Sequence, residues 1–460
     1  MRPKRETKRT GEPTSSRPLD WINLLLNRQR FLYPRRPTIQ LQVKTILNRV
    51  QHFPGFVYRE VRMEPESGSI EILVEPHGGR RARCSRCRQP APGYDRLPER
   101  NWQFVPLWGL PTHFRYAPRR VQCPEHQVVV EEIPWSGGKS PVTLAMMIFL
   151  AGWARRLSWR ETARAFQTSW EAVYRSVAWF VAWGLAHRDL RGVTAIGVDE
   201  IHWGRGMKAD NFLTVLYQID AGSRRLLWVG KRRSQASLKR GLKVLGPEVV
   251  KGIRFVCSDM WKPYLQVIKS QVGHALHVLD RFHVASHLNR AVDEVRRNET
   301  ARLRVKSKES ARRLKHMRWT LLRRGSRVRG RARQKLNALV ASKLATARAW
   351  ELKEGFAHFW KYKSVIWAGA FLDCWCFRAM RSRLEPMKRV ARMLRAHEPL
   401  LLNWFRAKGE LSSGPVEGLN NKIRVVTRRS YGFRTYKAME VALYHNLGRL
   451  PEPPSTHKFC

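Results

Sequence analysis

Hydrophobic positions change their spacing near residue 194. Before that point, apolar residues recur every three or four positions between residues 142 and 188, which predicts amphipathic helices. After it, short apolar runs separated by polar turns predict strands over TAIGVD (194–199), NFLTVLYQID (211–220), RLLWVG (225–230), IRFVCSD (253–259) and HALHVLD (274–280). Helical stretches over 237–246 and 261–270 separate the last three runs. This part of the chain therefore combines strands and helices.

Two aspartates close strands of this predicted sheet. Three strands followed by alternating helix and strand predict an α/β sheet of the RNase H-like type. Asp199 would end its first strand and Asp259 its fourth, and that fold brings these two strand ends side by side. An Asp at a strand end is more often a turn or cap residue, so neither aspartate indicates a function on its own.

A third carboxylate, Glu417, lies in a predicted amphipathic helix, GPVEGLNNKIRVVTRRSYGF. At 100° per residue, one face of this helix carries Glu417 with polar neighbours, and the opposite face is apolar. The polar neighbours are Asn420, Asn421, Arg424 and Arg428, and the apolar residues are Leu419, Ile423 and Val426. We expect the two asparagines to support the site and the two arginines to contact DNA phosphates. Three converging carboxylates can hold two Mg²⁺ ions, for which Mn²⁺ can substitute, and such pairs catalyse phosphodiester displacement.

The spacing of the three acids predicts an insertion. Asp259 follows Asp199 by 60 residues, but Glu417 follows Asp259 by 158, more than one strand and one crossover helix require. The composition from about 300 to 408 is almost purely helical, with fourteen basic residues between Arg302 and Arg333 and few acids. This basic run is either a solvated face or a DNA-backbone contact, which we favour. The arginines chosen as DNA contacts here are Arg312, Arg313, Arg323 and Arg324.

The N-terminal part of the chain contains a candidate metal site. An amphipathic helix from about Thr38 precedes two strand-like runs, GFVYREVRM and SIEILVEP. Two knuckles follow, CSRC at 84–87 and CPEH at 123–126, separated by 35 residues. Four protein ligands suit a structural Zn²⁺ site, although chance pairing of the two knuckles is the alternative. The predicted ligands are Cys84, Cys87, Cys123 and His126.

The centre of the helical stretch before residue 194 predicts a helix–turn–helix. Arg160 to Phe166 would form its first helix, 167–169 the turn, and Trp170 to Phe180 a second helix able to enter a major groove. A plain helical hairpin within a larger core is the alternative. Arg160, Arg164 and Arg175 favour DNA binding.

Charge identifies the class of partner. The 460 residues carry a formal net charge of +51, which indicates a polyanionic partner such as nucleic acid. The chain has no apolar run of the roughly 20 residues that a membrane-spanning helix needs, and its basic N-terminus lacks the apolar core of a signal peptide. We therefore expect a cytoplasmic protein without a membrane partner. Its seven cysteines do not suggest a disulfide framework.

The motif GPVEGLNNKIRVVTRRSYGFR, with VDE around Asp199, SDM around Asp259 and LDRFHV around Asp280, resembles the bacterial DDE transposases of the ISL-three insertion-sequence family. The resemblance extends from about residue 38 to about 450. It implies that Asp199, Asp259 and Glu417 are the catalytic acids, and it raises the expectation of an RNase H-like domain. It also implies a supporting role for Asp280 and His283, for which a structural Asp–His pair is an equally good explanation. His126 stands where relatives usually show a cysteine.

These observations predict a transposase that binds the terminal inverted repeats of its own element, cuts the DNA and joins the liberated 3′-OH to target DNA. Its partners would be double-stranded DNA and at least one further copy of the chain, and it would associate with the bacterial nucleoid. The alternatives are a DNA-binding regulator with a decayed nuclease domain, or an RNase H-like structure-specific nuclease.

The expected organisation has seven segments in order along the chain. They are a flexible basic arm (1–37), a β-hairpin and zinc-binding domain (38–136), a helix–turn–helix domain (137–190), a first catalytic part (191–299), a helical insertion (300–408), a second catalytic part (409–450) and a tail (451–460).

Overall fold

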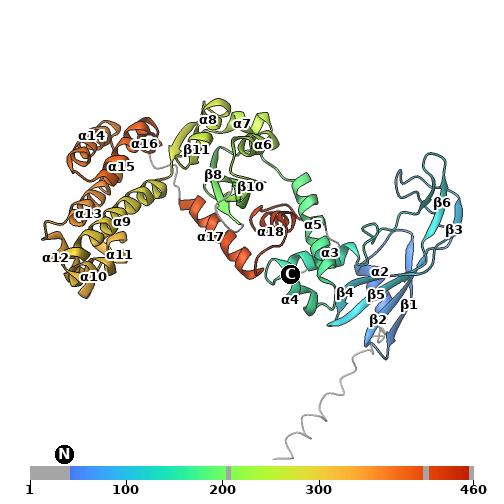
Figure 1. The fold of residues 1–460 in the computed structure, drawn as a ribbon. Helices are drawn as coiled ribbons and strands as arrows, with labels where there is room; N and C mark the ends of the chain where they lie inside the picture. The colour runs from blue at the N-terminus through green and yellow to red at the C-terminus, as the bar shows by residue number, and fades with distance from the viewer. Residues whose placement is uncertain (1–41, 204–208, 408–413, 455–460) are drawn as a thin grey trace, which may run out of the picture.

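The computed structural model describes residues 42–203, 209–407 and 414–454. A five-stranded sheet lies at the centre, two smaller sheets lie on the N-terminal side, and a group of helices lies on the other side (Figure 1). The basic arm predicted for 1–37 falls outside the described residues, as does most of the predicted tail. No helix of the described residues is long and apolar enough to span a membrane.

The N-terminal sheet has four strands in the order β1-β2-β5-β4. The strands are β1 (Phe56–Glu64), β2 (Ser69–Pro76), β4 (Arg100–Leu107) and β5 (Leu110–Tyr116). Helix α2 (Val43–Val50) covers the sheet, and aromatic rings around the buried Trp135 fill its core. β1 and β2 pair antiparallel, so the two strand-like runs predicted from the sequence form a hairpin.

A three-stranded sheet in the order β3-β6-β7 carries the two cysteine knuckles. Its strands are β3 (Gly93–Arg96), β6 (Arg119–Cys123) and β7 (Gln127–Val130). The small core beneath it contains Cys84, Cys123 and Val121. Such a core buries little apolar surface, so the module needs another source of stability.

Three helices follow, α3 (Leu144–Ala154), α4 (Trp159–Ala165) and α5 (Trp170–Ala186). Each starts at a side-chain cap, and Ser158 forms a reciprocal capping box with Glu161 at the start of α4. The hydroxyls of Thr143 and Ser169 cap α3 and α5. The α4–α5 connection coincides with the turn that the sequence predicted.

The central sheet has the order β10-β9-β8-β11-β12. Its strands are β8 (Ala195–His202), β9 (Phe212–Gln218), β10 (Arg225–Lys231), β11 (Phe255–Ser258) and β12 (Leu276–Leu279). β9 runs antiparallel to β8 and β10, whereas β11 runs parallel to β8 and β12. All five strand runs predicted from the sequence therefore join one mixed sheet.

Helices cover both faces of this sheet. One face packs against α6 (Gln235–Leu245), α7 (Pro247–Gly252) and α8 (Lys262–Gln271), through residues such as Ile196 and Val198. The other face packs against α5, α17 (Gly414–Arg429) and α18 (Tyr436–Leu447). Alternate residues of β8 therefore meet different neighbours, and Asp199 lies on the same face as Ala195, toward α17.

A second large core holds the helices between β12 and α17. They are α9 (Arg281–Lys306), α10 (Lys308–His316), α11 (Arg318–Leu322), α12 (Gly330–Val340), α13 (Ala345–Phe356), α14 (Val365–Arg381), α15 (Glu385–Ala396) and α16 (Glu398–Arg406). α9 begins directly after β12 and passes through residue 300 without a break. The side-chain amide of Asn403 on α16 donates to the carbonyl of His277 on β12 at 2.7 Å. The last helix of this group therefore lies against the edge strand of the central sheet.

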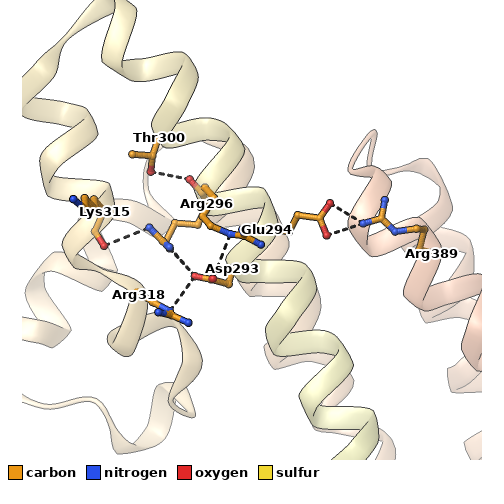
Figure 2. A network of polar contacts seen from close by, with 8 residues as sticks. Asp293, Glu294, Arg296, Thr300, Lys315, Arg318 and Arg389 are labelled. Atoms are coloured by element: carbon orange, nitrogen blue, oxygen red, sulfur yellow. Dashed lines mark hydrogen bonds and ion pairs between the residues drawn. The ribbon is translucent and has the colours of Figure 1, made fainter. Parts of the chain in front are cut away.

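Ion pairs connect α9 with its neighbours (Figure 2). Asp293 accepts hydrogen bonds from the buried Arg296 and lies 3.5 Å from Arg318 of α11. Glu294, one residue further, makes two contacts of 2.7 Å with Arg389 of α15. Because both acids lie at the middle of α9, the helix is held there on two sides, by α11 and by α15.

Candidate active site

Asp199 lies within β8 and its carboxylate is buried. The prediction that Asp199 ends this strand was wrong, because β8 stays paired with β9 for three more residues, as far as His202. Oδ1 accepts the backbone N–H of Glu200 at 2.8 Å, and Oδ2 accepts the side-chain N–H of Asn420 at 2.5 Å. The Tyr217 hydroxyl donates to Oδ1 of Asn420 at 2.7 Å and so fixes the orientation of the amide. Burial raises the pKa of Asp199, and the Glu200 N–H, the charge of His283 and Asn420 partly offset this rise. The site therefore favours a bound cation or proton at this carboxylate.

Asp259 follows the end of β11 and is also buried. The parallel ladder pairs Cys257 of β11 with Gly197 of β8, so Asp259 and Asp199 both lie two residues beyond the last pair. Oδ1 of Asp259 accepts the backbone N–H of Trp261 at 3.1 Å, and Oδ2 lies 3.2 Å from Arg233. The negative charge of Asp259 adds to the factors that raise the pKa of Asp199, as expected for neighbouring carboxylates.

Arg233 is a site residue that the sequence did not reveal. Its guanidinium lies 4.3 Å from the Trp261 ring centroid, and its Nε lies 2.8 Å from Oε2 of Glu200. The same side chain therefore links Glu200 with Asp259. Burial, together with the charge of Asp259, raises the pKa of Glu200 to about 8, although Arg233 opposes the rise. The only sequence signal of Arg233 is a short basic run, KRRS, directly after the third strand.

Glu417 lies in the first turn of α17 and is exposed to solvent. Leu419, Ile423 and Val426 of this helix are buried, so the apolar face predicted from the sequence packs inward. Glu417 precedes Asn420 by one turn, which places both on the side of α17 that meets Asp199. The helix approaches β8 closely, because a Cβ added to Gly197 would lie 2.6 Å from Cγ2 of Val416.

The three carboxylates provide only oxygen ligands, which suits Mg²⁺. Among the described residues, however, Asp199, Asp259 and Glu417 do not form a cluster whose ligand atoms all lie within 4.8 Å of one another. The two aspartates lie on the sheet and Glu417 lies across from them on α17. An ion held by all three would therefore draw the Glu417 side chain inward.

The remaining predicted supporting residues lie at different places. Asp280 caps α9 by accepting the backbone N–H of Phe282 at 2.8 Å, and its Oδ2 lies 4.0 Å from Nε2 of His283. His283 is close enough to influence the pKa of Asp199. Asn421 is exposed and accepts a hydrogen bond from Arg424 at 2.8 Å, so it faces solvent instead of Asp199.

The N-terminal knuckles bring four ligands together. The Sγ atoms of Cys87 and Cys123 lie 3.6 Å apart, and Nδ1 of His126 lies 3.8 Å from Sγ of Cys84 and 3.7 Å from Sγ of Cys123. All four ligand atoms lie within 4.8 Å of one another. A tetrahedral zinc ion with Zn–S bonds of about 2.3 Å requires ligand separations of roughly 3.7 Å. The cluster therefore fits Zn²⁺.

The arginines predicted to contact DNA are all exposed: Arg160, Arg164, Arg175, Arg312, Arg313, Arg323, Arg324, Arg424 and Arg428. Arg175 and Arg313 pair with the acid four residues earlier, Glu171 and Glu309. The fourteen cations from Arg302 to Arg333 are likewise all exposed. Exposed ion pairs contribute little to stability, so this surface is available to a polyanion at small cost.

Comparison with known proteins adds independent information. A family model described as transposase matches residues 196–443, which include the central sheet, the helices after it and α17. The chain is 28% identical over 418 residues to the transposase for insertion sequence element IS1557 of Mycobacterium tuberculosis, a match that covers 85% of this chain and 92% of the relative. It is 25% identical over 394 residues to the transposase for insertion sequence element IS1001 of Bordetella parapertussis, covering 85% and 95%.

Proposed function

The chain belongs to the ISL-three family of transposases, and from this premise we propose that it binds the terminal inverted repeats of an insertion sequence, cleaves the DNA at those ends and transfers the 3′-OH strands to target DNA. Asp199, Asp259 and Glu417 are the proposed catalytic acids, with Asp280, His283 and Asn420 in support. The net charge of +51 supports DNA as the partner.

One observation carries this proposal. Asp199, within β8, and Asp259, directly after β11, lie at the same level of adjacent parallel strands, and Asn420 ties the helix that bears Glu417 to Asp199. The strand order β10-β9-β8-β11-β12, with only β9 antiparallel to its neighbours, supports an RNase H-like arrangement. This arrangement supports a site shared by Asp259 and Glu417, which are separated by 158 positions in the sequence.

The chemistry follows from the charges at this edge. When bound, two divalent ions would activate the attacking oxygen and stabilise the leaving oxygen of the phosphodiester. Asp199 and Asp259 would hold them from the sheet, and Glu417 from α17. Asn420 keeps the Asp199 carboxylate in one orientation, and Tyr217 keeps the amide from rotating. Arg233 contacts Asp259 from the opposite side. The Trp261 ring and the Glu200 carboxylate in turn hold the Arg233 guanidinium in place.

The other parts of the chain would bind DNA. We propose that the zinc module (38–136) and a helix–turn–helix formed by α4 and α5 recognise the ends, and that the helical insertion grips the phosphate backbone. Ser158 and Ser169 cap the two helices across a short turn, which supports the helix–turn–helix assignment. Synapsis of two ends requires at least a dimer on DNA.

The DNA around the gene gives the first test of this proposal. Terminal inverted repeats bracketed by short direct duplications are expected. A labelled repeat duplex incubated with the purified protein, Mg²⁺ and a target plasmid should yield cut ends and joined products. Cleavage without joining would indicate a structure-specific nuclease, and repeat binding without cleavage would indicate a regulator.

A further inference from the structure

The turn between α17 and α18 holds an aromatic residue in an unusual position. Tyr431 has a φ of 52°, in the left-handed region, and Gly432 follows with a φ of 89°. The Gly432 N–H donates to the Thr427 carbonyl at 2.9 Å, and the Tyr431 N–H to the Arg428 carbonyl at 3.0 Å. These two bonds form the motif that ends many helices, in which the residue at the place of Tyr431 is usually glycine.

The Tyr431 side chain gains little within the chain to offset this strain. It is 95% exposed, the highest value among the exposed large hydrophobic residues of the described structure. No aromatic stacking or cation–π contact is found for its ring among the described residues. The next aromatic, Phe433, packs against the main core and lies 6.1 Å from Trp159 of α4. The turn is therefore anchored by one aromatic ring while it presents the other to solvent.

The surroundings of Tyr431 suit a nucleic acid. Arg428 and Arg434 flank it and are exposed, and Arg424 lies one turn earlier on α17. Through Phe433 and Trp159, the turn touches α4 of the proposed helix–turn–helix. It thus lies between the proposed end-binding helices and the helix that carries Glu417. An exposed aromatic ring among arginines is a stacking platform for bases.

We propose that Tyr431 stacks on a base that has left the duplex stack of the element-end DNA, at a fixed distance from the cleaved phosphate. This inference rests on the proposed function. Tyr431 follows Glu417 by 14 residues, and at about 1.5 Å per residue α17 spans roughly 20 Å between them. A duplex along α17, with about 3.4 Å per base step, places the stacked base about six base pairs from the cut.

The test uses duplexes of the terminal repeat in which 2-aminopurine replaces one base at a time, with Ca²⁺ in place of Mg²⁺ to prevent cleavage. The wild-type protein should change the fluorescence at one position, about six base pairs from the cut, as the base leaves the duplex stack and meets the Tyr431 ring. Tyr431→Phe should behave in the same way. Tyr431→Gly should abolish the change and weaken binding by ~5–100-fold, because the displaced base no longer has a ring to stack on. Tyr362→Ala, at a partly exposed tyrosine of the insertion, is the matched control and should change neither signal.

A second measurement excludes misfolding as the explanation. Tyr431→Gly relieves the left-handed backbone, so its thermal unfolding midpoint should rise by ~1–3 °C while DNA engagement falls. A glycine variant that keeps the fluorescence profile and affinity of the wild type would overturn the stacking role but leave the transposase proposal intact. If the wild type itself does not distinguish the repeat from a scrambled duplex, the proposed function fails, and this inference fails with it.

Discussion

The side-chain amide of Asn420 donates a 2.5 Å hydrogen bond to the carboxylate of Asp199. The bond joins residues that are 221 positions apart, across the whole helical insertion. Together with the Tyr217–Asn420 bond, it links the sheet directly to the helix that carries Glu417, and it fixes one oxygen of Asp199 while leaving that carboxylate able to bind a cation.

Replacing Asn420 with Ala should lower the single-turnover rate of DNA-end cleavage by about 10–100-fold, the usual effect of losing a group that orients a metal ligand. Asn421→Ala is the matched control, because Asn421 contacts Arg424 and is exposed. Its cleavage rate should stay within about threefold of the wild type. Equal losses in the two variants would show that the Asn420–Asp199 bond has no special role.

The zinc site gives a prediction about stability. Purified protein should contain one equivalent of zinc, and Cys84→Ser or Cys123→Ser should unfold the N-terminal module, since metal binding supplies the folding free energy of such small cores. Metal analysis and limited proteolysis measure these effects. Cys374→Ser, at an exposed cysteine of the insertion, should change neither. Well-folded protein without zinc would contradict the assignment.

The basic surface of the insertion gives a prediction about salt. Replacing Arg323, Arg324, Arg327 and Arg329 with Gln should weaken binding to all DNA sequences alike. The slope of log affinity against log salt should fall by about 0.9 for each phosphate that the variant no longer neutralises. Preference for the terminal repeat over a scrambled duplex should persist. If the salt slope stays and the preference disappears, this surface reads bases instead of gripping phosphates.

Stability should depend on pH through His445. Burial, together with the nearby Arg155 and Arg429, lowers the pKa of His445 to about 3 in the folded chain. The unfolded chain takes up a proton near the ordinary value of about 6.5, so stability is lost as the pH falls from there toward 3. His445→Leu should flatten the decline of the thermal midpoint between pH 7 and 4.5. The exposed His77→Gln is the control, and identical slopes for all three proteins would refute the argument.

Much of the central sheet could be predicted because strand signals are local. The five apolar runs, the position of Asp259 directly after β11 and the apolar face of α17 all depend on short stretches of sequence. Proximity between Asp199 and Asn420, or between Arg233 and Asp259, is not local and leaves no periodic signal. Arg233 in particular is one cation among 87 lysines and arginines, and only the packing of Trp261 and Glu200 singles it out.

The start of the helical insertion shows the same limit. Residues 281–306 form one helix whose first turn is capped by Asp280, whereas the domain boundary predicted from the sequence lies at 300, where the basic run begins. The basic run begins within α9, near its C-terminal end, whereas the chain leaves the central sheet at the N-terminus of α9. A charge pattern reports solvent exposure and cannot by itself locate the start of a helix.

The rate of Mg²⁺-dependent cleavage of a labelled terminal-repeat duplex tests the central claim most directly. It should be measured for the wild type, Asp199→Ala, Asp259→Ala and Glu417→Ala, with end binding recorded on the same preparations. Asp189→Ala, at an exposed acid of the turn before β8, serves as the control. Each of the three variants should lose cleavage by ~10³-fold or more while binding the repeat within about threefold of the wild type, because these carboxylates act in the transition state. If any one of them cleaves at near the wild-type rate, the proposed catalytic triad is wrong.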